Sequence, residues 1–107
     1  MSTTFVSADA AIGTSRTLLY TCPSGTQAVA FSGTIANIDD TNMATHLITA
    51  EVQKTDSSYV SLLNYVMVPY GRSLSFPKLV LQAGEKLYVK AELASTLAAR
   101  ISIVERV

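Results

Sequence analysis

Alternating apolar and polar side chains, interrupted by short turn sequences, run through almost the whole of this chain. Every second side chain is apolar in residues 87–93, and residues 48–53 and 99–104 follow the same period. Successive side chains of a β-strand point to opposite faces of the sheet, so a period of two indicates a strand with one buried face. The chain is therefore expected to form antiparallel sheets.

Turn sequences divide the chain at about the spacing of 8 to 12 residues that all-β sandwiches show. They lie at residues 23–25, 39–42, 56–58, 69–72 and 83–85. About eight strands joined by turns predict an all-β, two-sheet antiparallel sandwich. A jelly-roll-like connectivity is expected, and an immunoglobulin-like sandwich is the alternative. Immunoglobulin domains have a cysteine pair and a core tryptophan, whereas this sequence has one cysteine and no tryptophan.

One domain is expected in this chain of 107 residues. Residues 1–15 are mostly small and polar, which suits an N-terminal arm or an edge strand. Residues 16–107 are then a single β-sandwich domain. Residues 93–99 contain helix-favouring alanine and leucine but include Ser95 and Thr96, so we expect a turn or bulge between the last two strands.

Gly33 stands in the middle of a predicted strand. The period of two places Val29, Phe31, Gly33 and Ile35 on one inward face. Glycine inside a strand marks either a β-bulge or the close approach of a large neighbouring side chain. One of these two features is expected at Gly33.

Residues 59–70 are apolar on both sides of the predicted strand. They form either a central strand whose second face lies under a loop or the N-terminal arm, or a strand whose outer face meets another subunit. Exposed apolar patches usually mark contact sites. The candidate interface residues are Phe5, Tyr59, Leu63, Tyr65, Met67 and Tyr70.

The composition favours a protein that works inside an assembly. The net charge is zero, charged residues make up 15% of the chain, and the mean hydropathy is +0.31. A small free monomer normally gains solubility from net charge. Nucleic acid is not an expected partner because the lysines and arginines are scattered singly.

A membrane is not an expected partner either. No apolar run approaches the roughly 18 residues that span a bilayer, and the first residues lack the basic and apolar regions of a signal peptide. We expect the chain to be made and used in a cytosol, at least initially. Cys22 is the single cysteine, so no disulfide within the chain is expected.

Few residues offer catalytic or metal-binding chemistry. Cys22 and His46 each end or begin a predicted strand, and their spacing does not require them to meet. The oxygen-rich residues 39–42 lack the pattern of a calcium loop and suit a turn held by Asx side chains. Glu51 and Glu92 fall on polar faces. No catalytic residue, metal site or cofactor is therefore predicted.

Three segments carry a resemblance to a known type of protein: the strand end and Pro-x-Gly turn of residues 19–26 (LYTCPSGT), the alternating strand of residues 31–37 that ends in Asn37, and residues 81–87 (LQAGEKL). Together they resemble small β-sandwich virion structural proteins of tailed bacteriophages. The resemblance covers roughly residues 16–92. Cys22 stands where such sequences more often have an aliphatic residue.

The resemblance implies a non-enzymatic structural protein located in the virion. Capsid decoration is the expected role, with a collar, tail or baseplate component as the alternative. The expected partners are other virion proteins and copies of the chain itself, which it would bind through sheet faces, strand edges and the N-terminal arm. A carbohydrate-binding module for host attachment is a further alternative, because exposed tyrosines also stack on sugars.

Overall fold

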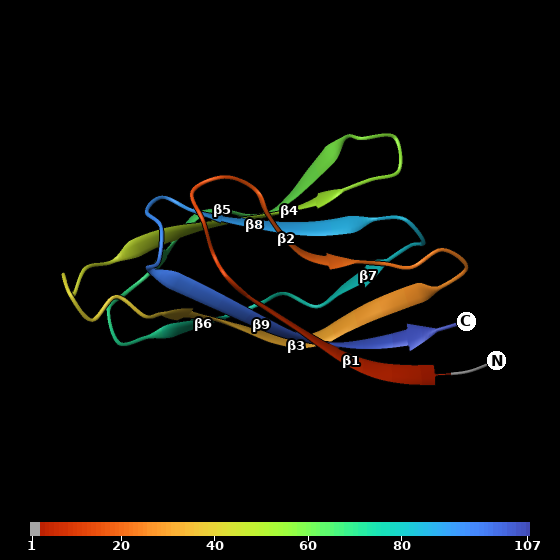
Figure 1. Cartoon of the computed structure of the whole chain (residues 1–107), viewed down its shortest axis with the longest axis horizontal. Coiled ribbons are helices and arrows are strands. Elements are labelled where there is room, and N and C mark those ends of the chain that lie inside the picture. Colours follow the sequence, from red (N-terminus) through yellow and green to blue (C-terminus); the bar gives the residue numbers. More distant parts are fainter. Residues whose placement is uncertain (1–2) are drawn as a thin grey trace.

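The computed structural model describes residues 3–107, and these form two antiparallel β-sheets packed face to face (Figure 1). Sheet A has the strand order β1-β9-β3-β6, with β7 also paired to β3, and sheet B has the order β2-β8-β4-β5. The strands are β1 (Thr3–Ala11), β2 (Thr17–Thr21), β3 (Gln27–Asn37), β4 (His46–Gln53), β5 (Tyr59–Val68), β6 (Ser73–Ser75), β7 (Leu79–Leu81), β8 (Lys86–Ala91) and β9 (Leu97–Arg106). The predicted all-β sandwich is confirmed.

Strand pairing is nested along the chain. β1 pairs with β9, β2 with β8, β3 with both β6 and β7, and β4 with β5. β6 and β7 are separated by Phe76, Pro77 and Lys78, as expected where a proline cannot donate to a sheet ladder. Nesting brings the two ends of the chain to the same end of the sandwich (Figure 1).

The core lies between the sheets and is built from alternate residues of the central strands. Ile48 of β4, Leu87 of β8 and Ile101 of β9 are almost completely buried. Their polar sequence neighbours point away from the core, as the period of two predicts. No helix of the length and apolar character needed to cross a membrane occurs among residues 3–107.

A β-bulge in β3 corrects the predicted faces of that strand. The register with β9 shifts between Ala30 and Ser32, so Phe31 is the extra residue. Before the bulge Ala30 is buried, and after it Ile35 is buried, while Val29 is only half-buried. Val29 and Phe31 therefore do not share the inward face with Gly33, because one inserted residue exchanges the faces of a strand.

Gly33 itself faces inward, and both features expected there are present. The bulge immediately precedes it, and large side chains approach it closely. A Cβ atom built on Gly33 would lie 2.7 Å from Cγ2 of Ile101 and 2.8 Å from Cβ of Phe76.

The N-terminal segment contains an edge strand rather than a cover for sheet B. β1 pairs along its whole length with β9 at the border of sheet A. Residues 1 and 2 of the predicted arm lie outside the described residues.

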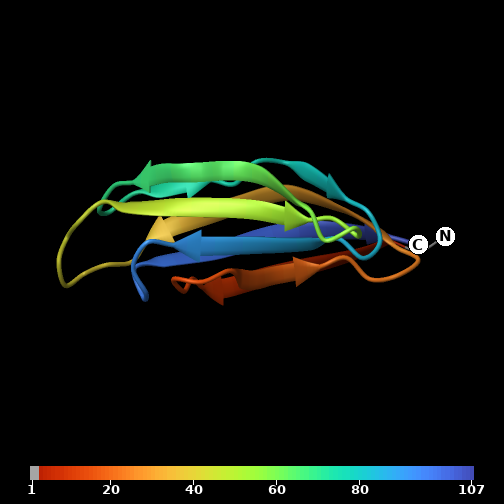
Figure 2. The same ribbon diagram turned by 90° about the horizontal axis from the view of Figure 1, so that it is seen from above.

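Strand β5 is the border of sheet B, so the interpretation of residues 59–70 as a central strand is wrong. Figure 2 shows β5 beside β6 and β7 along one long side of the sandwich, with β1 and β2 along the other.

The five predicted Pro, Gly and Asx turns lie between strands, whereas the turn expected over residues 93–99 occupies residues 92–96 and residues 97–99 already belong to β9. One end of the sandwich is held by Asn37, the last residue of β3. Its Nδ2 atom donates to the carbonyl oxygens of Ala44 (2.8 Å) and Val68 (2.9 Å), and its Oδ1 atom accepts from the backbone nitrogen of Asp39 (3.0 Å). Asn37 thereby ties the loop between β3 and β4 to the end of β5.

Candidate interaction surfaces

Four apolar side chains form a row across the outer face of sheet A. Phe5 of β1 lies opposite Val104 of β9, Val104 opposite Val29 of β3, and Val29 opposite Val80 of β7. Residues directly opposite each other on neighbouring strands have Cβ atoms about 4.5–5.5 Å apart, so the four side chains are consecutive neighbours. Phe5 is 76% exposed and Val80 is 53% exposed, while the two valines between them are half-buried. We call these four residues the sheet A row.

The neighbouring row on the same face is small and polar. Ser7, Ser102 and Ser32 lie opposite one another on β1, β9 and β3. These short side chains project less from the sheet than the apolar side chains of the sheet A row beside them. Such a surface suits a flat protein partner, which can pack on the apolar row while its polar groups reach the serine hydroxyls.

The two long border strands have few of the features that usually prevent edge-to-edge association, although β5 has bulges where its register with β4 shifts. β1 has nine residues with Asp9 as its one charged side chain, and β5 has ten residues with none. Proteins commonly protect sheet edges with charges, proline or short strands. The opposite borders have such protection, since β2 has five residues and β6 and β7 have three each.

The predicted interface residues fall on both sheets and are not brought together. Phe5 belongs to the sheet A row, whereas Tyr59, Leu63, Tyr65 and Met67 lie on β5 in sheet B. Tyr65 and Met67 are 59% and 66% exposed. Tyr70 lies in the turn after β5 and is also exposed.

Two of the predicted residues have neighbours that the sequence did not reveal. Leu63 is half-buried and packs against the core, because register shifts in β5 place it opposite buried Ala50. The ring of Tyr59 lies under the guanidinium of Arg16, whose Cζ atom is 3.8 Å from the ring centroid. Arg16 also pairs with Glu51, with 2.9 Å between Nε and Oε1. Tyr59 is thus part of a polar cluster on sheet B.

A buried histidine joins two carboxylates at the end of the sandwich that Asn37 closes. The Nε2 atom of His46 lies 2.6 Å from Oδ2 of Asp39, and its Nδ1 atom is hydrogen-bonded to Oε1 of Glu92. Asp39 also accepts the backbone N–H groups of Thr41 and Asn42 through Oδ1, which confirms the predicted turn chemistry. The hydrogen bond that Asp39 accepts, followed by the one that Glu92 accepts, raises the pKa of His46 despite its burial. Each ring nitrogen faces a carboxylate oxygen, an arrangement that favours the protonated form of the ring.

The same contacts act in the opposite direction on Asp39. The backbone N–H of Asn42 and the hydrogen bond from His46 lower the pKa of its carboxyl. Sequence reasoning missed this cluster because its three members come from a loop, the start of β4 and the residue after β8, with no characteristic spacing. His46 at the start of a strand was the one part that the pattern predicted.

Stability should depend on pH through this cluster. The folded pKa of His46 is raised, so its stabilising contribution is complete below the unfolded value of about 6.5 and is lost as the pH rises through the folded pKa. The folded pKa of Asp39 is lowered, so its contribution is lost as the pH falls through that value. We expect His46→Gln to have a lower thermal midpoint of unfolding than the wild type. Its midpoint should also lack the decrease that the wild type shows as the pH rises through the folded pKa of His46. Thermal unfolding followed by circular dichroism across the pH range checks this, and parallel profiles for the two proteins would contradict it.

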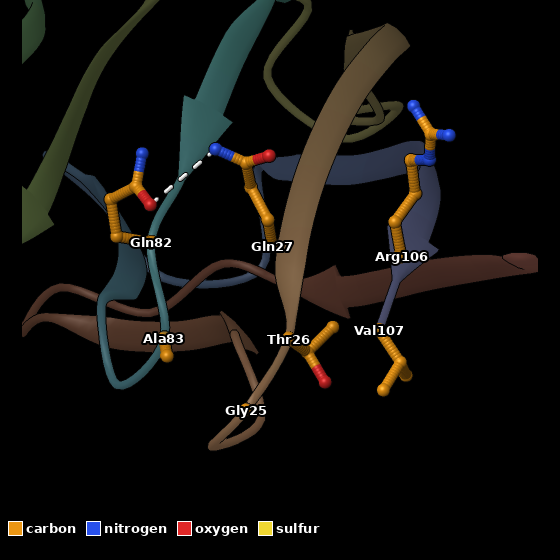
Figure 3. A pocket seen from close by; sticks show the side chains of 7 residues that line it. All are labelled: Gly25, Thr26, Gln27, Gln82, Ala83, Arg106 and Val107. Atoms are coloured by element: carbon orange, nitrogen blue, oxygen red, sulfur yellow. Dashed lines mark hydrogen bonds between the residues drawn. The ribbon is translucent and has the colours of Figure 1, made fainter. Parts of the chain in front are cut away.

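The other end of the sandwich has a shallow hollow of about 380 Å³ between the turn after β2 and the turn after β7. Figure 3 shows Gln27 and Gln82 pointing toward one another across it, with Nε2 and Oε1 3.4 Å apart, while Thr26 and Val107 line its lower part. The residues that line it include no histidine, cysteine, aspartate or glutamate.

Cys22 and His46 lie at opposite ends of β3. The Cys22 thiol is buried and donates to the carbonyl oxygen of Thr26, just before β3, whereas His46 contacts Asp39, just after it. An eleven-residue strand such as β3 spans about 35 Å, so the two side chains form no dyad. Burial raises the pKa of Cys22, which disfavours its thiolate. Among residues 3–107 there is no group of three or more His, Cys, Asp or Glu side chains arranged to hold a metal ion.

Comparison with known proteins gives no family for this chain. The sequence matches no family model and is not significantly similar to any curated protein.

Proposed function

We propose that this chain is a non-enzymatic structural protein of a bacteriophage particle, and that it decorates the capsid. It acts by binding neighbouring subunits through the sheet A row and through the edges of β1 and β5. A position in the collar, tail or baseplate is the alternative within the same class. The observation that carries the proposal is the sheet A row, an apolar strip across four strands with Phe5 at its exposed end.

The charge pattern supports an assembling subunit. A chain without net charge, with two long and almost uncharged border strands, has little to oppose association with a neighbour. Strand addition at such an edge supplies backbone hydrogen bonds. The sheet A row would supply the apolar contact area, because apolar anchors surrounded by polar groups are typical of interface centres.

The nested pairing of strands supports the jelly-roll connectivity. If β6 and β7 are taken as one interrupted strand, residues 3–107 contain eight strands, the number in a jelly roll. The pairs β1–β9, β2–β8, β3–β6/β7 and β4–β5 then lie one inside another along the chain, like the arms of a single long hairpin. We assign this connectivity in preference to the immunoglobulin-like alternative. Jelly rolls are common in viral capsid domains, which agrees with the resemblance carried by residues 19–26, 31–37 and 81–87.

Mass spectrometry of intact, purified particles from the virus that encodes this chain tests the proposal. We expect the chain to be present at a fixed copy number set by the symmetry of its site. Hundreds of copies support capsid decoration, and about a dozen copies support a collar or baseplate ring. Absence of the chain from purified particles would overturn the proposal.

A further inference from the structure

The outer face of sheet B contains a second hollow, of about 210 Å³, beneath Tyr65. It is lined by Thr14, Leu47, Thr49, Tyr65, Lys90, Ala91 and Glu92. It lies on the opposite sheet from the sheet A row, and the proposed assembly function does not use it. We call it the Tyr65 hollow.

Residues from four parts of the chain build this hollow. Thr49 of β4 lies opposite Lys90 of β8, and both point to the outer face of sheet B. Tyr65 comes from the border strand β5 and Thr14 from the loop between β1 and β2, so they stand at opposite sides of the sheet. The hollow is therefore a depression across a rigid sheet, with an aromatic side chain at one wall.

The backbone at Tyr65 has an unusual conformation that belongs to this wall. Tyr65 has a φ of 52°, and the register between β4 and β5 shifts at the same place. A positive φ is uncommon for a bulky side chain. Bulges re-aim side chains next to binding sites. Here the bulge places Tyr65 beside Thr49 and Lys90 at the hollow, and no residue within 3–107 makes a hydrogen bond or ring contact with its phenol ring.

The charges around the hollow balance. The ammonium of Lys90 and the carboxylate of Glu92 both line it. One is a cation and the other an anion, and Oε1 of Glu92 is already engaged by Nδ1 of His46. A site without net charge does not favour an anion such as phosphate, nor a cation. It favours a neutral ligand that presents both donors and acceptors.

We propose that the Tyr65 hollow binds one neutral pyranose ring, as the terminal hexose of a glycan. The tyrosine ring stacks on the C–H face of the sugar. The carboxylate of Glu92 accepts from sugar hydroxyls, and the ammonium of Lys90 and the hydroxyls of Thr14 and Thr49 complete the hydrogen bonds. The volume agrees with a single ring, because pockets for larger, drug-sized ligands occupy about 300 Å³ or more.

Titration of the isotope-labelled full-length protein with methyl glycosides of glucose, galactose, mannose and N-acetylglucosamine tests this inference by NMR. We expect at least one of them to shift the amide signals of Thr49, Tyr65 and Lys90 in a saturable way. Tyr65→Ala should weaken that binding about tenfold or more, and Tyr70→Ala, which removes an exposed tyrosine outside the hollow, should leave it unchanged.

A second variant keeps the test valid if Tyr65→Ala disturbs the bulge. Lys90→Gln removes the charge without changing the backbone of β8, and it should also weaken sugar binding. No saturable shift with any of the four glycosides would overturn the inference, and so would equal losses from Tyr65→Ala and Tyr70→Ala. Tighter binding of the acidic sugar sialic acid than of every neutral glycoside would overturn the neutral-ligand argument. These outcomes are independent of whether the chain is found in virus particles.

Discussion

Replacing Asn37 with alanine is expected to lower the free energy of unfolding by about 2–4 kcal/mol, because three hydrogen bonds are lost together. Nδ2 of Asn37 is the donor for two carbonyl oxygens, those of Ala44 and Val68, and Oδ1 accepts from the backbone nitrogen of Asp39. Alanine replaces none of these groups. Chemical denaturation followed by circular dichroism measures the change.

Asn42→Ala is the matched control for this prediction. Asn42 lies in the same loop and is exposed, and its side chain makes no hydrogen bond. We expect its unfolding free energy to stay within about 0.5 kcal/mol of the wild type. If Asn37→Ala and Asn42→Ala were equally mild, Asn37 would not be the residue that closes this end of the sandwich.

Replacing Gly33 with alanine is expected to cost about 1–3 kcal/mol through overpacking. The added Cβ would lie 2.7 Å from Cγ2 of Ile101 and 2.8 Å from Cβ of Phe76. Both atoms belong to side chains held between the sheets, where close packing leaves little room to move. The same denaturation experiment gives the loss of stability.

Gly13→Ala provides the comparison for Gly33→Ala. A Cβ on Gly13 meets the Oγ1 atom of Thr17 at 3.4 Å, an ordinary contact. We therefore expect Gly13→Ala to be neutral or slightly stabilising, since alanine reduces the entropy of the unfolded chain. A stability for Gly33→Ala at or above that of Gly13→Ala would show that Ile101 and Phe76 do not crowd Gly33 as closely as described.

Much of the fold was predictable because its signals are local. The period of two in residues 48–53 and 87–93 produced strands β4 and β8, and the proline and glycine turns fell between strands as expected. Gly33 was also informative by itself. A glycine inside a strand predicts a bulge or a close large side chain, and Gly33 lies beside a bulge and two large side chains.

The faces of β3 and β5 could not be predicted because bulges leave no clear mark in the sequence. One extra residue at Phe31 moved Val29 to the outer face, where it joins Phe5, Val104 and Val80. Register shifts in β5 likewise turned Leu63 toward the core. Phe5 and Tyr65, which the sequence predicts to be interface residues, are both exposed, but the sequence could not assign them to different sheets.

The His46 cluster shows a second limit of sequence reasoning. Asp39, His46 and Glu92 meet only because β4 and β8 are neighbours in sheet B and the loop after β3 folds over their ends. Spacing along the chain carries no information about such a meeting. The same holds for the Tyr65 hollow, whose residues come from separate strands and a loop.

The account depends most on the claim that the sheet A row binds a neighbouring subunit, and sedimentation velocity over a concentration series tests it. We expect the wild-type chain to associate as its concentration rises and Phe5→Asp to remain monomeric. Ser24→Asp, which adds the same charge in the exposed turn after β2 and outside both the sheet A row and the serine row, should associate like the wild type. A wild-type chain that stays monomeric at every concentration, or equal association of Phe5→Asp and the wild type, would contradict the claim.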